Sequence, residues 1–246
     1  MGAQTERRLT PRDADCEYWN RAAHWFDAAA QFVVGAETQL VLKAWLYEQI
    51  DPNCSILELG CGTGQFSEVL ARGGGPLVAC DVSQAMLDIA RTRLKPFRNV
   101  TLREEDCHSV RMPAEIFDVV FMGNLLHVVR EPAAVLAEAR RLLRCDGKLV
   151  TVDSTLSGMP WWARLEMGIR YLLAFGPPSQ TNRVLSPREV AVMVHGAGFR
   201  VVDLALIGRE TCAICLTARK QPIRLERSAG GVDGPRPQLL TRMEDR

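Results

Sequence analysis

Three glycines at alternate positions follow an acidic residue in the stretch SILELGCGTGQ, residues 55–65. The glycines are Gly60, Gly62 and Gly64, and the acid is Glu58. Glycine lets the backbone turn sharply and places no Cβ in the way of a ligand. In open parallel sheets, a glycine loop just after a strand receives a ligand against its backbone. The stretch therefore predicts a binding site for a nucleotide-like molecule.

A second acid, Asp81, ends the next apolar segment, about 20 residues after the glycines, where a carboxylate can accept both hydroxyls of a ribose. The dinucleotide fingerprint is G-x-G-x-x-G, but here the third glycine comes one residue early and Gln65 stands in its place. The sequence also lacks the G-x-x-x-x-G-K-[ST] pattern of a phosphate-binding Walker loop. This spacing favours a nucleoside ligand without phosphates over a dinucleotide.

A parallel sheet would bring these residues to one edge, and the pattern of the chain predicts one. Short apolar segments alternate with helical ones, and Ser83 is a natural N-cap for the helix after Asp81. This alternation is typical of an α/β fold with helices on both faces of the sheet. The last two segments are separated by only three residues, which predicts an antiparallel hairpin. The predicted strands are 55–59, 76–81, 99–104, 117–122, 147–153, 200–207 and 211–219.

The same pattern divides the chain into regions. Residues 16–219 are predicted to form one domain, with a helical N-terminal cover (16–50) broken at Gly35, and an insert (154–185) that interrupts the alternation. Residues 1–15 are predicted to be flexible. Residues 220–246 are rich in glycine, proline and charge, so we expect a disordered tail.

Composition excludes several classes of partner. The 30 basic and 29 acidic side chains nearly cancel, so no general attraction to nucleic acid or anionic membrane is expected. No segment reaches the roughly 20 apolar residues of a membrane helix, so stable membrane insertion is not predicted. The eight cysteines lie mostly beside apolar segments, which suits buried free thiols in a reducing compartment, and a cytoplasmic location is predicted. The sequence does not indicate an oligomeric state.

Four segments carry a resemblance to a known family. LELGCGTGQFSEVLA, DVSQAMLDIAR, REEDCHSVRMPAEIFDVVFMGNLLHVV and EARRLLRCDGKLVTVD resemble, in this order, the motifs of class I S-adenosylmethionine-dependent methyltransferases. Residues 16–218 are similar to the branch that acts on small molecules such as quinones and natural products. The resemblance implies a Rossmann-like, seven-stranded, mostly parallel sheet with an antiparallel last strand. It also implies S-adenosylmethionine as the cofactor and no metal.

The resemblance also implies roles for single residues. Glu58, Gly60 and Gly62 would line the methionine part of the cofactor, with Gly64 in the same loop, and Asp81 would hold the ribose. Val82 and Met86 would pack on the adenine, Asp106 and Cys107 would face its polar edge, and Gly123 and Asn124 would lie near the sulfonium. Trp19 and Phe26 would belong to a cover over the acceptor; Asn20 stands where many relatives carry an acid.

On the acceptor side, three features leave alternatives open. His127, three residues after Asn124, is a candidate general base or a residue that shapes the loop. Trp161 and Trp162 begin an aromatic stretch in the insert that would form a substrate lid, pack in the core or touch a membrane. Cys212 and Cys215 have C-x-x-C spacing, but within a strand they would face opposite sides of the sheet, which favours core packing over a redox or metal pair.

The expected reaction is direct, in-line methyl transfer to a small, fairly apolar acceptor. Two alternatives were weighed against it. An arsenic methyltransferase would need several cysteines around the pocket, and no such set is expected here. A catalytically inactive relative that binds the cofactor and regulates a partner would carry a damaged cofactor loop, whereas the glycines and Asp81 are intact.

Overall fold

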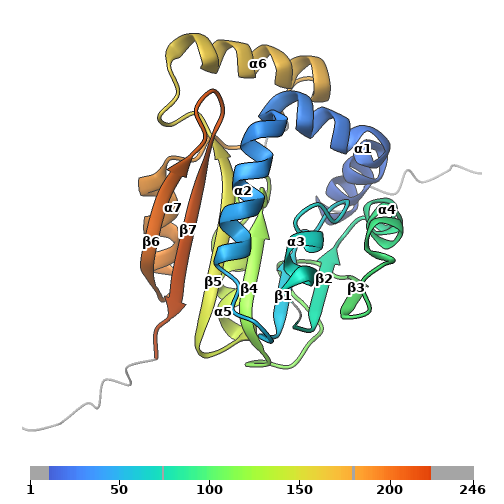
Figure 1. The fold of residues 1–246 in the computed structure, drawn as a ribbon, viewed down its shortest axis with the longest axis vertical. Coiled ribbons are helices and arrows are strands. Elements are labelled where there is room, and N and C mark those ends of the chain that lie inside the picture. The colour runs from blue at the N-terminus through green and yellow to red at the C-terminus, as the bar shows by residue number, and fades with distance from the viewer. Residues whose placement is uncertain (1–10, 74, 179–180, 223–246) are drawn as a thin grey trace, which may run out of the picture.

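The computed structural model of the protein describes residues 11–73, 75–178 and 181–222. Its centre is one seven-stranded sheet with strand order β3-β2-β1-β4-β5-β7-β6 (Figure 1). Neighbouring strands from β3 to β5 run parallel, and β7 pairs antiparallel with both β5 and β6. The strands are β1 (Ile56–Leu59), β2 (Leu77–Asp81), β3 (Val100–Glu104), β4 (Phe117–Gly123), β5 (Leu143–Thr155), β6 (Phe199–Ile207) and β7 (Cys212–Lys220). The predicted α/β fold with an antiparallel last strand is confirmed.

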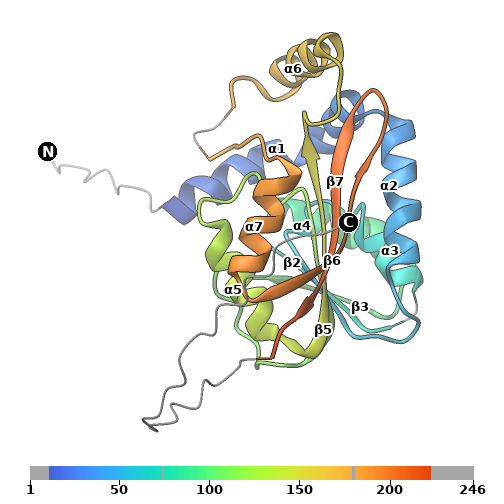
Figure 2. The same ribbon diagram turned by 90° about the vertical axis from the view of Figure 1, so that its left-hand side faces the viewer.

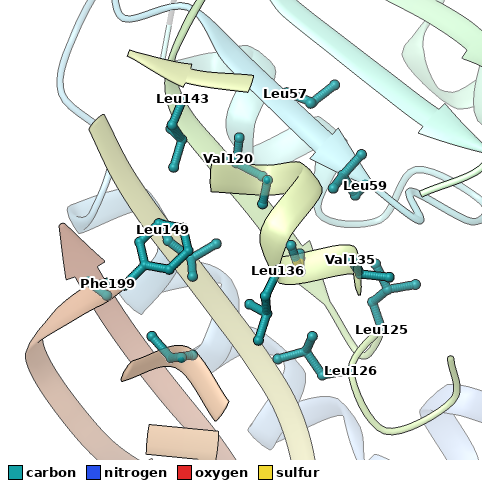
Figure 3. Packing of buried hydrophobic residues seen from close by; sticks show 14 of the residues in the cluster. Leu57, Leu59, Val120, Leu125, Leu126, Val135, Leu136, Leu143, Leu149 and Phe199 are labelled. Carbon is teal, nitrogen blue, oxygen red and sulfur yellow. The ribbon is translucent and has the colours of Figure 1, made fainter. Parts of the chain in front are cut away.

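Helices cover both faces of this sheet, as the turned view in Figure 2 shows. On one face, α5 and α7 pack with β1, β4 and β5 around a large apolar cluster (Figure 3). On the other face, α2, α3 and α4 pack around a second cluster. The helices are α1 (Pro11–Val34), α2 (Ala36–Glu48), α3 (Ser67–Arg72), α4 (Gln84–Leu94), α5 (Pro132–Leu142), α6 (Trp161–Phe175) and α7 (Pro187–Gly196).

The central strands are apolar because both of their faces are covered. All four residues of β1 are buried, and so are Val119, Val120, Phe121 and Met122 of β4. The strand order reverses between β1 and β4, whose carboxyl ends therefore open the crevice in which α/β proteins bind ligands.

Several local predictions are confirmed by the turns and caps. Gly35, at φ 83°, separates α1 from α2, as its position in the sequence predicts. Ser83 caps α4 by accepting a hydrogen bond from the Met86 N–H at 3.2 Å. A second cap, which the sequence analysis above does not include, is Ser186 of α7, which forms a reciprocal pair of bonds with Glu189.

The boundaries of the terminal regions differ in part from those predicted. Helix α1 begins at Pro11, so the domain boundary predicted at residue 16 falls inside a helix. The insert contains α6, which packs across α1 beyond the carboxyl ends of the strands (Figure 1). The predicted N-terminal segment up to residue 10, and the tail from 223 onwards, lie outside the described residues. Within the described part of the chain, no helix combines the length and apolar character needed to cross a bilayer.

Candidate active site

A cavity of about 390 Å³ lies at the carboxyl ends of the strands, beneath α1. Its volume falls in the range of roughly 300–1,000 Å³ that is usual for small-molecule sites. The glycine loop and the turns after β2, β3 and β4 form its floor, while α1 and α2 close it from above. Ten of the predicted cofactor residues line this cavity: Glu58, Gly60, Gly62, Asp81, Val82, Met86, Asp106, Cys107, Gly123 and Asn124.

The glycine loop is shaped to let a ligand reach the backbone. Gly62 has φ 52°, and a Cβ built on it would meet no atom within 4 Å, so a side chain there would occupy the cavity itself. A Cβ on Gly60, at φ 70°, would lie 2.6 Å from the Leu125 side chain. Gly64 does not line the cavity and instead lies against Ala90 and Leu94 of α4. The loop therefore has room above it for a bound molecule.

Asp81 is held in place by backbone donors. Its Oδ2 accepts from the Gly62 N–H at 2.8 Å, and its Oδ1 accepts from the Ser83 N–H at 2.9 Å. Burial raises the pKa of the Asp81 carboxyl, and the hydrogen bonds from these two N–H groups oppose that rise. Each carboxylate oxygen can accept a further bond. Two neighbouring hydroxyls of a bound ribose could donate one such bond to each oxygen.

Glu58 lies at the inner end of the cavity and is fully buried. The Ser67 hydroxyl donates to its Oε2 at 2.5 Å. Burial raises the pKa of Glu58 to about 8, and the negative charge of Asp81 adds to the rise while the bond from Ser67 opposes it. A positive charge brought close to this carboxyl would favour its ionised form. The residues present therefore fit a ligand that combines a ribose with a cationic end.

The turn after β3 and the start of α4 also contribute to the cavity lining. Asp106 Oδ1 accepts from the His108 N–H at 2.9 Å and lies 2.8 Å from His108 Nδ1. Met86 supplies an apolar surface beside these groups. Among the described residues, Asp106, Cys107 and His108 are the one cluster close enough to share a metal ion. All three line the cavity, so this cluster belongs to the same site.

Helix α1 covers the cavity, and Trp19 and Phe26 line it as predicted. Their ring centroids lie 6.0 Å apart in an edge-on arrangement. Asn20 accepts from the Ser83 hydroxyl at 2.7 Å and from the Ala85 N–H at 3.2 Å. An amide oxygen at this position therefore supplies a cover contact without a negative charge.

Comparison with known proteins places this site in a family. Residues 57–151 match a family model described as a methyltransferase domain. The chain is 31% identical over 195 residues to a ubiquinone biosynthesis O-methyltransferase of Neisseria meningitidis, covering 74% of this chain and 79% of that protein. The chain belongs to the class I S-adenosylmethionine-dependent methyltransferases. Its cofactor is S-adenosylmethionine, as the sequence motifs predict.

Two further similarities bear on the fold and on the extent of the match. A methyltransferase structure from Thermotoga maritima, described as a possible histamine N-methyltransferase, has a TM-score of 0.64 at 19% identity and covers 84% of this chain and 99% of that one. A highly reducing polyketide synthase of Aspergillus nomiae is 34% identical over 118 residues. That match covers 43% of this chain but only 5% of the synthase, so this methyltransferase spans a small part of that relative.

The cysteines of the methyltransferase require one correction. The expectation that no set of cysteines surrounds the pocket was wrong, because Cys61, Cys80 and Cys107 all line the cavity. Burial raises the pKa of Cys61 well above its usual value and that of Cys80 to about 12. Both thiols are therefore protonated at neutral pH. Cys212 and Cys215 lie away from this cavity and belong to two different apolar clusters.

His127 lies outside the lining of the cavity, although its neighbours Leu125 and Val128 are part of it. Its Nδ1 lies 3.0 Å from Oδ1 of Asp153, and its N–H donates to the same oxygen at 3.3 Å. Asp153 is fully buried at the end of β5, and its Oδ2 has no hydrogen-bond partner among the described residues. The sequence alone did not predict this pair, because 26 residues separate its members.

Trp161 and Trp162 also lie outside the cavity lining, with exposed fractions of 76% and 49%. The side of α6 that meets α1 is instead formed by its C-terminal half. Phe175 lies 6.2 Å from Phe26 and 5.3 Å from Tyr171, measured between ring centroids. The tryptophans therefore project from the far end of the helix.

A polar network between α1, the glycine loop and α4 was not predicted. Asp27 accepts from the Thr63 hydroxyl at 2.5 Å and from Gln65 Nε2 at 2.8 Å, and its other oxygen pairs with Arg93. Arg93 Nη1 also donates to the Thr63 carbonyl at 2.7 Å. The polar Thr63 and Gln65 beside the glycines were the signal that could have indicated such a partner.

Proposed function

We propose that this methyltransferase transfers the methyl group to a hydroxyl of a small, largely apolar acceptor by direct in-line displacement. The observation that carries the proposal is the large apolar part of the cavity lining. The relative from Neisseria meningitidis is an O-methyltransferase of ubiquinone biosynthesis, which favours an aromatic hydroxyl. The apolar part of the lining is formed by Phe26, Ala30, Val34, Leu42, Phe66, Leu125, Val128 and Val129.

The residues around the cavity would have different roles in binding the cofactor and the acceptor. Asp81 would hold the ribose of the cofactor, and Glu58 and Gly62 would line its amino-acid end. Bound S-adenosylmethionine supplies a methyl group activated by a sulfonium. Alignment of the acceptor beneath α1 and exclusion of water would lower the activation free energy further, by on the order of 7–11 kcal/mol at best. This division needs no covalent intermediate on the protein.

His127 is the proposed general base. Its Nδ1 faces the buried Asp153 carboxylate, so Nδ1–H donates to Asp153 and Nε2 keeps the lone pair that takes a proton. Asp153 orients the ring in the manner of the third member of a hydrolase triad. In this proposal the acceptor would extend past Leu125 and Val128 to reach His127. Nε2 would then take the hydroxyl proton as the new O–CH3 bond forms and the S–CH3 bond of the cofactor breaks.

Helix α6 is the proposed cover over the acceptor. Of its residues only Ala163 is buried, and it contacts the rest of the protein chiefly through α1. An element with so little buried surface opens at small cost, which a lid requires. In this proposal, the segment 154–185 closes when the acceptor binds.

The direct test is incubation of the purified protein with methyl-labelled S-adenosylmethionine and a panel of apolar phenols, hydroquinones, amines and thiols. We expect a labelled methyl ether from at least one phenol or hydroquinone, identified by mass spectrometry. Label in amines or thiols alone would contradict hydroxyl transfer. Binding of the cofactor without any labelled product, from the panel and from a metabolite extract, would favour the inactive relative.

The base is tested separately by His127→Gln. Loss of a general base lowers kcat by roughly 10²–10⁴-fold. The affinity for S-adenosylhomocysteine, measured by calorimetry, should stay unchanged, because His127 lies outside the cavity lining. His195→Gln on α7 is the matched control and should leave kcat unchanged. Equal kcat in wild type and His127→Gln would remove His127 from the mechanism.

A further inference from the structure

Helix α1 is a wall of the cofactor cavity, and this makes its attachment to the domain relevant to ligand exchange. Trp19, Phe26, Ala30 and Val34 of α1 line the cavity opposite the glycine loop. In Figure 1, α1 passes over the carboxyl ends of the strands between α4 and α6. A molecule enclosed between α1 and the glycine loop leaves most directly when α1 moves away.

One carboxylate connects α1 to the two elements beneath it. Asp27 Oδ1 accepts from Thr63 and Gln65 of the glycine loop, and Oδ2 pairs with Arg93 of α4. Arg93 in turn donates to the carbonyl and the hydroxyl of Thr63, at 2.7 and 3.1 Å. The three segments therefore share one ion pair with neutral donors beside it. The bonds from Ser83 and Ala85 to Asn20 and an apolar cluster around Met86 add to the contact between α1 and α4.

The environment of this ion pair makes it stronger than an ordinary surface pair. The side chains of Arg93 and Asp27 are 26% and 36% exposed, against 60% and 59% for Arg91 and Asp88 on the outer side of α4. Partial burial acts to raise the pKa of Asp27, but the hydrogen bonds from Thr63, Gln65 and Arg93 outweigh it and hold the pKa below its usual value. Asp27 is therefore ionised at neutral pH, and its charge is matched by the charge and the donors around it.

We propose that Asp27 is a positioning residue that latches α1 onto the glycine loop and thereby sets the rate at which the cofactor and its demethylated product enter and leave. The latch holds the closed state, and the site exchanges ligand only in the fraction of time that α1 is open. Because the apparent association rate scales with that open fraction, a weaker latch raises both the association and the dissociation rate constants. The proposal concerns the cofactor alone, so it does not depend on which acceptor is methylated.

The proposal is tested with Asp27→Asn, which keeps the size of the side chain and removes its charge. The probe is S-adenosylhomocysteine, and Trp19 in the cavity wall provides a fluorescence signal for stopped-flow mixing. Loss of one charge-assisted hydrogen bond changes an equilibrium constant, here that between closed and open α1, by a factor of about ten or more. We expect both rate constants to rise by about tenfold, with a smaller change in Kd.

Two further variants and one independent readout accompany this test. Arg93→Met should reproduce the rise in both rate constants, whereas Arg91→Met, which removes the exposed pair on the same helix, should leave them within twofold of wild type. Hydrogen exchange should increase in α1 of Asp27→Asn without ligand while the core strands stay protected. If Asp27→Asn does not fold, Thr63→Val takes its place, because it removes one donor from the latch. Both rate constants should then rise by a smaller factor.

Three results would overturn the latch. Unchanged rate constants in the Asp27 and Arg93 variants would show that α1 opens independently of the pair. Faster dissociation with unchanged association would make Asp27 an affinity residue without a gating role. An equal effect from Arg91→Met would attribute the change to the general charge of α4.

Discussion

The two neighbours of α1 hold it by different means. Towards α4 and the glycine loop, α1 is fixed by Asp27 and Asn20 through hydrogen bonds to defined partners. Towards α6, the contacts involve aromatic rings. Phe175 lies beside Phe26, and the Arg170 guanidinium lies 5.9 Å from the centroid of the Phe32 ring. Polar bonds fix one geometry, whereas apolar ring contacts permit sliding. We therefore expect one defined geometry on the cofactor side while the latch is closed, and a more adaptable contact on the proposed acceptor side.

Burial shows the same contrast. Helix α4 buries four residues, Met86, Leu87, Ala90 and Leu94, against one in α6. Helix α6 exposes six large apolar side chains: Trp161, Trp162, Leu165, Ile169, Leu172 and Leu173. If the account is right, substitutions on the cofactor side change stability and cofactor binding, and substitutions in α6 change the handling of the acceptor.

The largest effect is expected at Glu58, on the cofactor side. Its pKa of about 8 in the folded protein exceeds its ordinary value of 4.5, so the folded state binds a proton that the unfolded state has released. The contribution of Glu58 to stability is therefore greatest below pH 4.5 and falls as the pH rises towards 8. Glu58→Gln keeps the bond from Ser67 without this titration. Relative to Glu58→Gln, wild type should lose on the order of a few kcal/mol across this range.

Urea unfolding of both proteins at a series of pH values measures this difference. The ligand must be absent, because a cation in the cavity favours ionised Glu58. If the free energies of unfolding of wild type and Glu58→Gln change in parallel between pH 4.5 and pH 8, Glu58 does not titrate in this range. That result would mean that a partner absent from the folded structure keeps Glu58 ionised.

A matched pair of glycine substitutions gives the next largest effect. Gly60→Ala forces a side chain into the left-handed region against Leu125, which costs about 1–2 kcal/mol and should weaken cofactor binding. A Cβ added to Gly168 of α6 would have no atom within 4 Å, so Gly168→Ala should stabilise the helix by up to about 1 kcal/mol. Thermal unfolding gives the sign of each change. A stabilised Gly60→Ala that still binds cofactor would mean that the loop tolerates a Cβ.

The smallest effect on stability is expected at the tryptophans of α6. Because Trp161 and Trp162 are exposed, each change to alanine should alter the free energy of unfolding by at most about 0.5 kcal/mol. If α6 closes over the acceptor, the same variants raise KM or lower kcat for the acceptor and leave cofactor affinity unchanged. Val192→Ala on α7, also exposed, is the control. Wild-type kinetics in both tryptophan variants would remove them from the acceptor site.

The parts of the site that sequence predicted are those encoded within a few residues. The glycines, Asp81 and the Ser83 cap each depend on their immediate neighbours in the chain, and the strand pattern placed them at one edge of the sheet. Ten of the predicted cofactor residues line the cavity for this reason, whereas Gly64 lies outside its lining, packed against Ala90.

The parts that sequence missed depend on contacts between distant segments. Asp27 and Arg93 are 66 residues apart and meet only because α1 crosses above α4. His127 finds Asp153 through the pairing of β4 with β5. The cysteines of the cavity were missed because each was considered within its own segment. Cys61, Cys80 and Cys107 lie near or just after the ends of β1, β2 and β3, and the neighbouring positions of these strands in the sheet bring them together.

The most direct test of the central claim is calorimetry with S-adenosylhomocysteine, NAD and ATP on the wild-type protein and on Asp81→Ala. The account predicts micromolar binding of S-adenosylhomocysteine to wild type. It predicts no binding of NAD, because the third glycine comes one residue too early for a dinucleotide site, and none of ATP, because the sequence lacks a Walker loop. Removal of the Asp81 carboxylate should weaken S-adenosylhomocysteine binding by roughly 1.5–3 kcal/mol, the usual contribution of a hydrogen bond to a charged group. Tight binding of NAD, or equal affinity for S-adenosylhomocysteine in both proteins, would contradict the assignment of the cavity beneath α1.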